Sequence, residues 1–436
     1  MKNLLFIHAH DAGRHLSPYG YRVATSQLEA LAAEGVVMRD AHCAAPTCSP
    51  SRAAMWTGLT AHENAMLGLV HRGFELRDRS RHLMVHLGAA GYHTVLVGIQ
   101  HEFNPAPGSG PAVYGEQLAE GTGPGEQRDA RVAQRAARFL GEAPRGPWAL
   151  SVGFFYPHRE FLPAPAGAAA TVKVPDILPD RLEVREDYAR YAASVAEMDR
   201  CVGLILKSLA DSGRAEDTVV VFTTDHGIAF PGMKCSLTAH GTGVGLILRA
   251  PGDLAAGRAC DALVSHLDLP ATLCDLLGAP PPALGHGRSF AGLLREGGQV
   301  FREDVFAEVN AHASLEPMRG VRTKRFNLIV RFDDDLRRAW ANVDNGPSKD
   351  LWMRLHADTP LERVQLFDLE RDPQERCNVA DHPAYASARS EMEGRLRRWM
   401  TDTRDPLLEG PLRLPSGAKV NPRECTDPRD PCVIVA

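Results

Sequence analysis

Residues 218–227 read TVVVFTTDHG, a β-branched run that ends in an aspartate, a histidine and a glycine. Consecutive branched and aromatic side chains are typical of a strand buried on both faces, as in a parallel sheet. Other short apolar runs precede it and alternate with helical stretches, among them residues 187–212, which end at Gly213. This alternation predicts an α/β fold, in which a large, mostly parallel or mixed sheet is sandwiched by helices.

Two units are expected along the chain, because 436 residues are too many for one simple core. The first, residues 1–300, is the predicted catalytic domain, with further strands at 4–7, 36–38, 94–97, 148–155 and 245–248 and helices at 26–34 and 83–90. The second, residues 301–436, is predicted to form a smaller antiparallel sheet from runs at 305–309, 318–323, 326–332 and 364–369, with one helix at 385–400. The Pro- and Gly-rich stretches 105–125 and 162–181 are predicted to be surface loops near the substrate entrance.

Composition gives no reason to expect nucleic acid or a membrane as a partner. The net charge is -5, and no run approaches the roughly 20 apolar residues that a membrane span needs. The N-terminal apolar run meets His8 and His10 without a small-residue cleavage site, so it predicts a buried strand and not a signal peptide. The nine cysteines are scattered and odd in number, which favours a reducing compartment and predicts a cytoplasmic protein. A homo-oligomer stays open.

Four chemically active side chains share one kind of position. Asp11, His101, His158 and Asp225 each come just after a predicted strand. In open α/β sheets ligands bind at the carboxyl ends of the strands. The shared placement therefore predicts that these side chains gather in one site.

The segment Cys48-Ser49-Pro50-Ser51-Arg52, followed by Thr57-Gly58, carries the sharpest signal. Taken alone, it is equally compatible with a buried free cysteine ahead of a helix. It resembles the C-x-P-S-R signature of the sulfatase family, in the alkaline phosphatase-like superfamily. The resemblance implies that Cys48 is oxidised by a maturation enzyme to formylglycine, whose hydrate attacks sulfur as a covalent nucleophile. Arg52, four residues on, can face the same side of a helix.

The resemblance extends over nearly the whole chain and is strongest to the heparan N-sulfatase (sulfamidase) branch. The matching segments are Asn3–Ile7 with His10-Asp11, Phe155–Arg159, Thr223–Gly227, Phe230–Lys234, and Leu366–Leu369 with Asp372-Pro373. It implies hydrolysis of a sulfate ester or a sulfamate in a small anionic substrate. Two other readings remain: hydrolysis of a phosphodiester or phosphonate monoester at the same site, and a non-catalytic binding protein with the same fold.

A metal site follows from the same resemblance. Asp11 and Asp225 match the family's ligands, together with Cys48 as formylglycine, while His10 and His226 stand where aspartate and asparagine or histidine are usual. The family usually binds one calcium ion, which prefers oxygen ligands. Two imidazoles would shift the preference toward manganese, zinc or iron.

The resemblance also implies roles for the remaining residues. His101 is the expected base and His158 the expected general acid, while Arg52 and Lys234 stabilise the anion. Ile99 replaces a lysine that the family places after Gly98, and Lys234, His240 or Arg14 are the candidates to compensate for its charge. Four residues are expected either to reach the substrate's leaving group or to lie on a solvated surface: Glu308, Asn310, His312 and Arg319. His240 is a further substrate-binding candidate.

Overall fold

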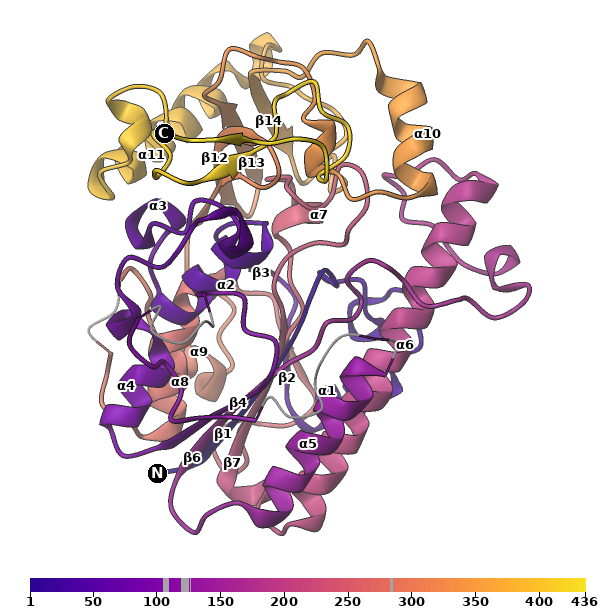
Figure 1. Cartoon of the computed structure of the whole chain (residues 1–436). Helices are drawn as coiled ribbons and strands as arrows, with labels where there is room; N and C mark the ends of the chain where they lie inside the picture. The colour runs from indigo at the N-terminus through magenta and orange to yellow at the C-terminus, as the bar shows by residue number, and fades with distance from the viewer. Residues whose placement is uncertain (105–109, 119–124, 126, 283–284) are drawn as a thin grey trace.

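The computed structural model describes residues 1–104, 110–118, 125, 127–282 and 285–436. Its largest element is an eight-stranded sheet with the strand order β5-β4-β6-β1-β7-β8-β2-β9 (Figure 1). Only β8 runs antiparallel to its neighbours within this sheet, so the predicted mostly parallel sheet is confirmed. The strands are β1 Asn3–Ala9, β2 Val36–Met38, β4 His93–Gly98, β5 Glu116–Gln117, β6 Trp148–Gly153, β7 Thr218–Thr224, β8 Leu246–Arg249 and β9 Arg258–Cys260.

Helices cover both faces of this sheet, and the alternation of strand side chains explains why. In β1, Leu5 and Ile7 join the core beneath one helical layer, whereas Leu4 and Phe6 join the core beneath the other. The first layer contains α1 Ser26–Glu34, α5 Arg128–Glu142 and α6 Leu182–Asp211; the second contains α2 Cys48–Thr57, α4 Leu83–Ala89, α8 Leu269–Leu277 and α9 Ala291–Glu296. Figure 1 shows α5 and α6 on one side and α4, α8 and α9 on the other.

A four-stranded antiparallel sheet follows, as predicted, with the order β11-β12-β13-β14. Its strands are β11 Asp304–Ala311, β12 Leu315–Thr323, β13 Phe326–Arg331 and β14 Val364–Asp368, and α11 Ala386–Asp402 packs on it. Its core includes Ala53 of α2 and Phe74. The smaller sheet therefore packs directly on the helix that begins at Cys48.

The remaining segments add little to the framework. Residues 162–181 contain only a short 3-10 turn, Ala168–Ala170. Part of the 105–125 stretch lies outside the described residues, and the rest includes the edge strand β5, so the loop prediction was wrong at Glu116–Gln117. The division at residue 300 falls between α9 and β11, and whether the two parts are separate domains stays a prediction. Among the described residues, no helix is both long and apolar enough to cross a membrane.

Replacing Phe222 with alanine tests the central strand. Phe222 of β7 is fully buried in the core, so its truncation is expected to lower the free energy of unfolding by about 3–5 kcal/mol. A denaturant titration measures this change. Val300, which is 83% exposed, provides the control. Val300→Ala is expected to change the free energy of unfolding by no more than about 0.5 kcal/mol. Equal effects of the two substitutions would contradict the assigned core.

Candidate active site

The site begins with the pairing of β1 and β7. These strands are parallel neighbours, with Ala9 opposite Thr224, so His10-Asp11 and Asp225-His226 leave the sheet side by side. The Asp11 amide donates to Asp225 Oδ1 over 2.9 Å, which fixes the two turns to each other. The position after His226 can only be glycine, because a Cβ at Gly227 would lie 1.9 Å from the carbonyl oxygen of His240.

Helix α2 brings its first residue, Cys48, to the same place. All ten residues of α2 are buried. The Ser51 hydroxyl donates to the Asp225 carbonyl over 2.5 Å, and Arg52 Nε donates to Asp225 Oδ2 over 3.2 Å. Cys48 and Arg52 are one helical turn apart and face the same side. Asp225 therefore fixes the helix that presents Cys48.

Four buried donors form a compact group. Ligand atoms of His10, Asp11, Cys48 and Asp225 all lie within 4.8 Å of one another. His226 extends this group, since its Nε2 lies 3.3 Å from both Cys48 Sγ and Asp11 Oδ1. His226 Nδ1 donates to the Gly227 carbonyl, which leaves the Nε2 lone pair facing the group, the usual arrangement for a metal-binding histidine.

The protonation of these groups suits a divalent cation. Burial lowers the pKa of His10 to about 3, so its ring is neutral at pH 7, and its Nδ1 lies 3.1 Å from Asp225 Oδ2. Burial alone would raise the pKa of Asp225, but His226 and Arg52 hold it well below its usual range. Neutral imidazoles and ionised carboxylates are the forms that bind metals. The donor set therefore fits a divalent metal ion.

Lys234 lies against this group from another segment. Its ammonium contacts Asp11 Oδ2 at 3.0 Å and Asp344 Oδ2 at 3.2 Å. Although burial opposes the charged form, these two carboxylates raise the pKa of Lys234 well above its usual value. The site therefore keeps a permanent cation beside Asp11.

Two histidines at the rim are placed for proton transfer. The His158 ring donates from Nδ1 to the Arg159 carbonyl, and its Nε2 lies 3.9 Å from Asp11 Oδ2. The His101 ring centroid lies 5.9 Å from that of His10, and the ring stacks in parallel on His71. Burial lowers the pKa of His101 to about 3, so its ring is neutral at pH 7.

Comparison with known proteins agrees with this geometry. The sulfatase family model matches residues 2–279, and the model for the C-terminal part of N-sulphoglucosamine sulphohydrolase matches residues 236–350. The chain belongs to the sulfatase family. Human N-sulphoglucosamine sulphohydrolase is 30% identical over 94% of this chain and 92% of its own length. The Delta 4,5-hexuronate-2-O-sulfatase of Bacteroides thetaiotaomicron is 24% identical over 92% of this chain and 89% of its own.

Solved structures share the fold of this sulfatase. BT4656 in complex with its substrate D-glucosamine-2-N,6-O-disulfate superposes with a TM-score of 0.72 at 18% identity, covering 93% of this chain and 98% of that one. The phosphonate monoester hydrolase of Agrobacterium radiobacter superposes with a TM-score of 0.70 at 22% identity, covering 94% and 97%.

Some residues proposed from the sequence lie away from the Cys48 group. His240 Nε2 bonds the Gln374 carbonyl, and Arg14 donates to the Arg39 carbonyl, so neither compensates for the missing lysine. Of the three candidates, only Lys234 lies at the site. The Glu308 carboxylate is bound inside the fold by His62 and Arg319. It therefore holds the smaller sheet together and does not face a substrate.

Of the other three predicted residues in the smaller sheet, two are bound inside the fold and one lies near Lys234. Asn310 and Arg319 belong to the Glu308 network, and Arg319 is further paired with Asp405. His312 is buried, and its pKa is lowered by burial and by the charge of Lys234. Of the residues predicted in this sheet, His312 is thus the one near Lys234.

Sequence reasoning missed Asp344 and His8. Asp344 pairs with Lys234 from a loop that carries no motif, so only the folded chain brings the two together. His8 accepts from Arg52 through Nδ1 at 2.5 Å, and its Nε2 bonds Ser151. The two-residue period of a strand puts His8 on the same face as His10, which was an available signal.

Arg52→Ala is expected to lower turnover of this sulfatase on the order of a hundredfold or more. Because Arg52 binds the Asp225 carboxylate, the same change is expected to weaken metal affinity about 10–100-fold. Titration of the metal-depleted protein, alongside steady-state kinetics, measures both effects. Arg39→Ala, at an exposed ion pair with Asp261, is the control. Unchanged metal affinity in Arg52→Ala would contradict the role in holding Asp225.

Proposed function

We propose that this chain hydrolyses a sulfate ester or a sulfamate of a small anionic substrate, with Cys48 oxidised to formylglycine. The observation that carries the proposal is the position of Cys48, at the first turn of α2 and within 3.9 Å of Asp11. Burial raises the pKa of the Cys48 thiol well above its usual value. An unmodified thiol there is protonated at neutral pH and therefore a poor nucleophile. This favours the oxidised form.

A bound metal would be held by His10, Asp11, Asp225, His226 and the modified Cys48. When bound, it supplies Lewis acidity to the nucleophile and to a sulfate oxygen. Family resemblance favours calcium, whereas the nitrogen donors His10 and His226 favour manganese, zinc or iron.

Charge stabilisation and proton transfer would be carried out by three side chains of the protein. Lys234, whose charge is maintained by Asp11 and Asp344, is positioned to bind a sulfate oxygen and to stabilise developing negative charge. His158 is partly exposed and directs Nε2 toward the site, which suits protonation of the leaving oxygen or nitrogen. His101, whose ring lies beside that of His10, is given the role of accepting a proton from the hydrated side chain by the family resemblance.

The alternative substrate is a phosphonate monoester or phosphodiester. It is supported by the shared fold with a phosphonate monoester hydrolase and by Ile99, which removes one cation from the pocket. Turnover of an aryl sulfate and an aryl phosphonate at equal concentration separates the two. Faster hydrolysis of the phosphonate would favour the alternative.

The relatives suggest the wider context. Two of them are named for N-sulphoglucosamine and for a hexuronate 2-O-sulfate, so we propose a sulfated saccharide as the substrate class. Formylglycine also requires a maturation enzyme as a partner. The cytoplasmic location and a homo-oligomeric state stay predictions.

Mass spectrometry of the peptide that contains Cys48 tests the nucleophile. Formylglycine is expected there, about 18 Da lighter than cysteine, together with turnover of an aryl sulfate that depends on it. Cys48→Ala is expected to lose this turnover. Cys43→Ala is the matched control, because Cys43 is also a buried free cysteine but lies outside the signature. Full activity with an unmodified Cys48 would refute the proposal.

His158→Ala tests the general acid. With a poor leaving group, such as a sugar alcohol, turnover is expected to fall about 10²–10⁴-fold, whereas with nitrophenyl sulfate, which needs no protonation, it should fall far less. Steady-state kinetics on both substrates measures this difference. The same loss on both substrates would assign His158 to another role.

A further inference from the structure

Glu102 follows His101 in the turn after β4, and its side chain is completely buried. The chain turns sharply at His101, which has a φ of 76°. Gln100 fixes this turn, because its Oε1 accepts from the amides of Glu102 and Phe103 over 2.6 and 3.1 Å. The ring of His101 lies beside that of His10 at the rim of the site, whereas the Glu102 carboxyl group enters the interior.

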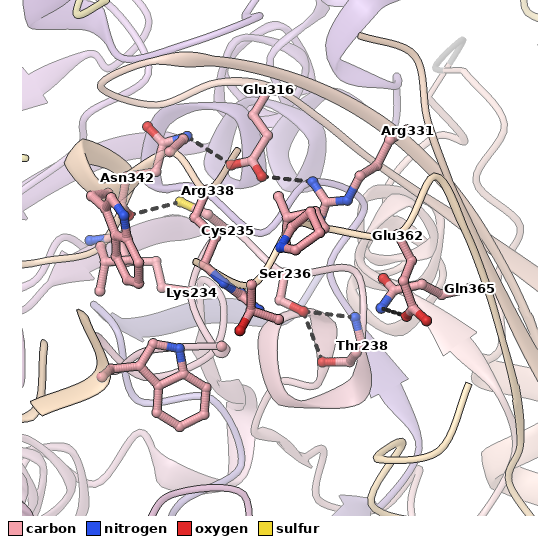
Figure 2. Close-up of a pocket in the computed structure, with 18 of the residues that line it drawn as sticks. Lys234, Cys235, Ser236, Thr238, Glu316, Arg331, Arg338, Asn342, Glu362 and Gln365 are labelled. Atoms are coloured by element: carbon pink, nitrogen blue, oxygen red, sulfur yellow. Dashed lines mark hydrogen bonds and ion pairs between the residues drawn. The ribbon is translucent and has the colours of Figure 1, made fainter. Parts of the chain in front are cut away.

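Glu102 lacks the cationic partner that every other buried glutamate of the described chain has. The buried glutamates among the described residues are Glu102, Glu308, Glu316 and Glu375. Each of the last three has an arginine within 3.3 Å, and Figure 2 shows Glu316 between Arg331 and Asn342. Neither oxygen of Glu102 makes an ion pair or a full hydrogen bond to a described residue. Because an isolated buried carboxylate is strongly disfavoured, the surroundings of Glu102 decide its charge.

Helix α2 supplies the polar groups that act on Glu102. Arg52 and Trp56 lie one helical turn apart in α2 and face the same side of it. Burial raises the pKa of Glu102 to about 7, although the charge of Arg52 and the indole N–H of Trp56 both act to lower it. The carboxyl group is therefore mostly neutral below pH 7 and mostly ionised above it.

The guanidinium of Arg52 has one nitrogen that is available to Glu102. Its Nε binds Asp225 over 3.2 Å, and its Nη1 binds His8. Its Nη2 is buried and has no hydrogen-bond partner within the described part of the chain. A buried donor and a buried acceptor are each costly when unpaired, and one water between them satisfies both. Nη2 of Arg52 and the oxygens of Glu102 are complementary in this sense.

The other titratable side chains packed around Glu102 and Arg52 are neutral at pH 7. Burial raises the pKa of the Tyr114 phenol well above its usual value. Burial also lowers the pKa of His82, whose ring contacts that of Tyr114, to about 3. The pKa of His8 is held well below its usual value by burial and by the charge of Arg52. None of the three therefore adds a charge that competes with Arg52.

The nearby groups on the polar turn itself do not compete either. His101, the residue before Glu102, is neutral at pH 7. Arg79 lies over the ring of the residue after Glu102, but its charge is paired with Glu75. Arg52 is therefore the cation on which a change at Glu102 acts most strongly.

We propose that Glu102 is a positioning residue for Arg52: it binds the unpartnered Nη2 across a bridging water and, once ionised, reduces the positive charge that Arg52 offers to Asp225 and to the sulfate. Glu102 touches no reacting atom and acts only through Arg52. The inference rests on the proposed function and deepens it, because it adds a residue that sets how strongly the site stabilises an anion.

The pH dependence of kcat with an aryl sulfate tests the effect on catalysis. Glu102→Gln is similar in shape and stays neutral, so it keeps the full charge of Arg52 at high pH. The ratio of its kcat to that of the wild type is expected to rise about tenfold between about pH 6 and about pH 8, because an ionised Glu102 weakens stabilisation of the anionic transition state. Other titrating groups cancel in this ratio. Glu116→Gln, at an exposed ion pair with His93, is the control and should give a constant ratio.

Infrared difference spectroscopy tests the link to Arg52 without turnover. The protonated-carboxyl band that the wild type shows and Glu102→Gln lacks is expected to titrate near pH 7. Isotopic labelling of glutamate confirms the residue type of this band. Arg52→Gln removes the charge that favours the ionised form, so the midpoint should move up by about one pH unit or more. Arg39→Ala, at the exposed pair with Asp261, should leave it unchanged.

Two outcomes would overturn the inference. A kcat ratio for Glu102→Gln that stays constant with pH would leave Glu102 a purely structural role. An unchanged midpoint in Arg52→Gln would show that the two side chains do not interact. Because the spectra need no turnover, failure of the proposed sulfatase chemistry would remove the kinetic ratio and leave the infrared result decisive.

Discussion

The carboxylate of Asp225 is the contact on which the site depends. One oxygen accepts from the backbone amides of Asp11 and His226, and the other lies against Arg52 and His10. It thereby joins the ends of two parallel strands to the helix that begins at Cys48. A buried carboxylate requires such partners, because an unpaired charge in the interior is strongly disfavoured. The same contacts that neutralise Asp225 also fix the positions of the reacting groups.

The charges of the site are balanced between the two parts of the chain. Asp11 and Asp225 face Arg52 and Lys234, and Lys234 also contacts Asp344, which lies in the segment between β13 and β14. Burial of α2 against that sheet reinforces this link. The smaller sheet, with the segment between β13 and β14, therefore holds Lys234 and the Cys48 helix in place.

Much of the fold could be predicted because burial imposes periodicity. The helix Ser26–Glu34 and the strand Val36–Met38 were predicted at their observed bounds, since one helical face and a whole strand are apolar. The helix Arg128–Glu142 was not predicted, although its buried residues Val132, Ala136, Phe139 and Leu140 recur at helical spacing. The two-residue strands β3 (Ala41–His42) and β10 (Val264–Ser265) are too short for any period. For the site, adjacent motif residues were predictable, whereas the Lys234–Asp344 pair and the inward binding of Glu308 depend on tertiary packing.

The central claim is that the Cys48 group holds a divalent metal. Anomalous diffraction from crystals of the purified protein, recorded on both sides of the metal's absorption edge, tests it most directly. The account predicts one peak per chain, about 2.0–2.6 Å from carboxylate oxygens of both Asp11 and Asp225. Full sulfatase activity in crystals or solution that contain no metal at this position, or a peak bound only elsewhere, would contradict it.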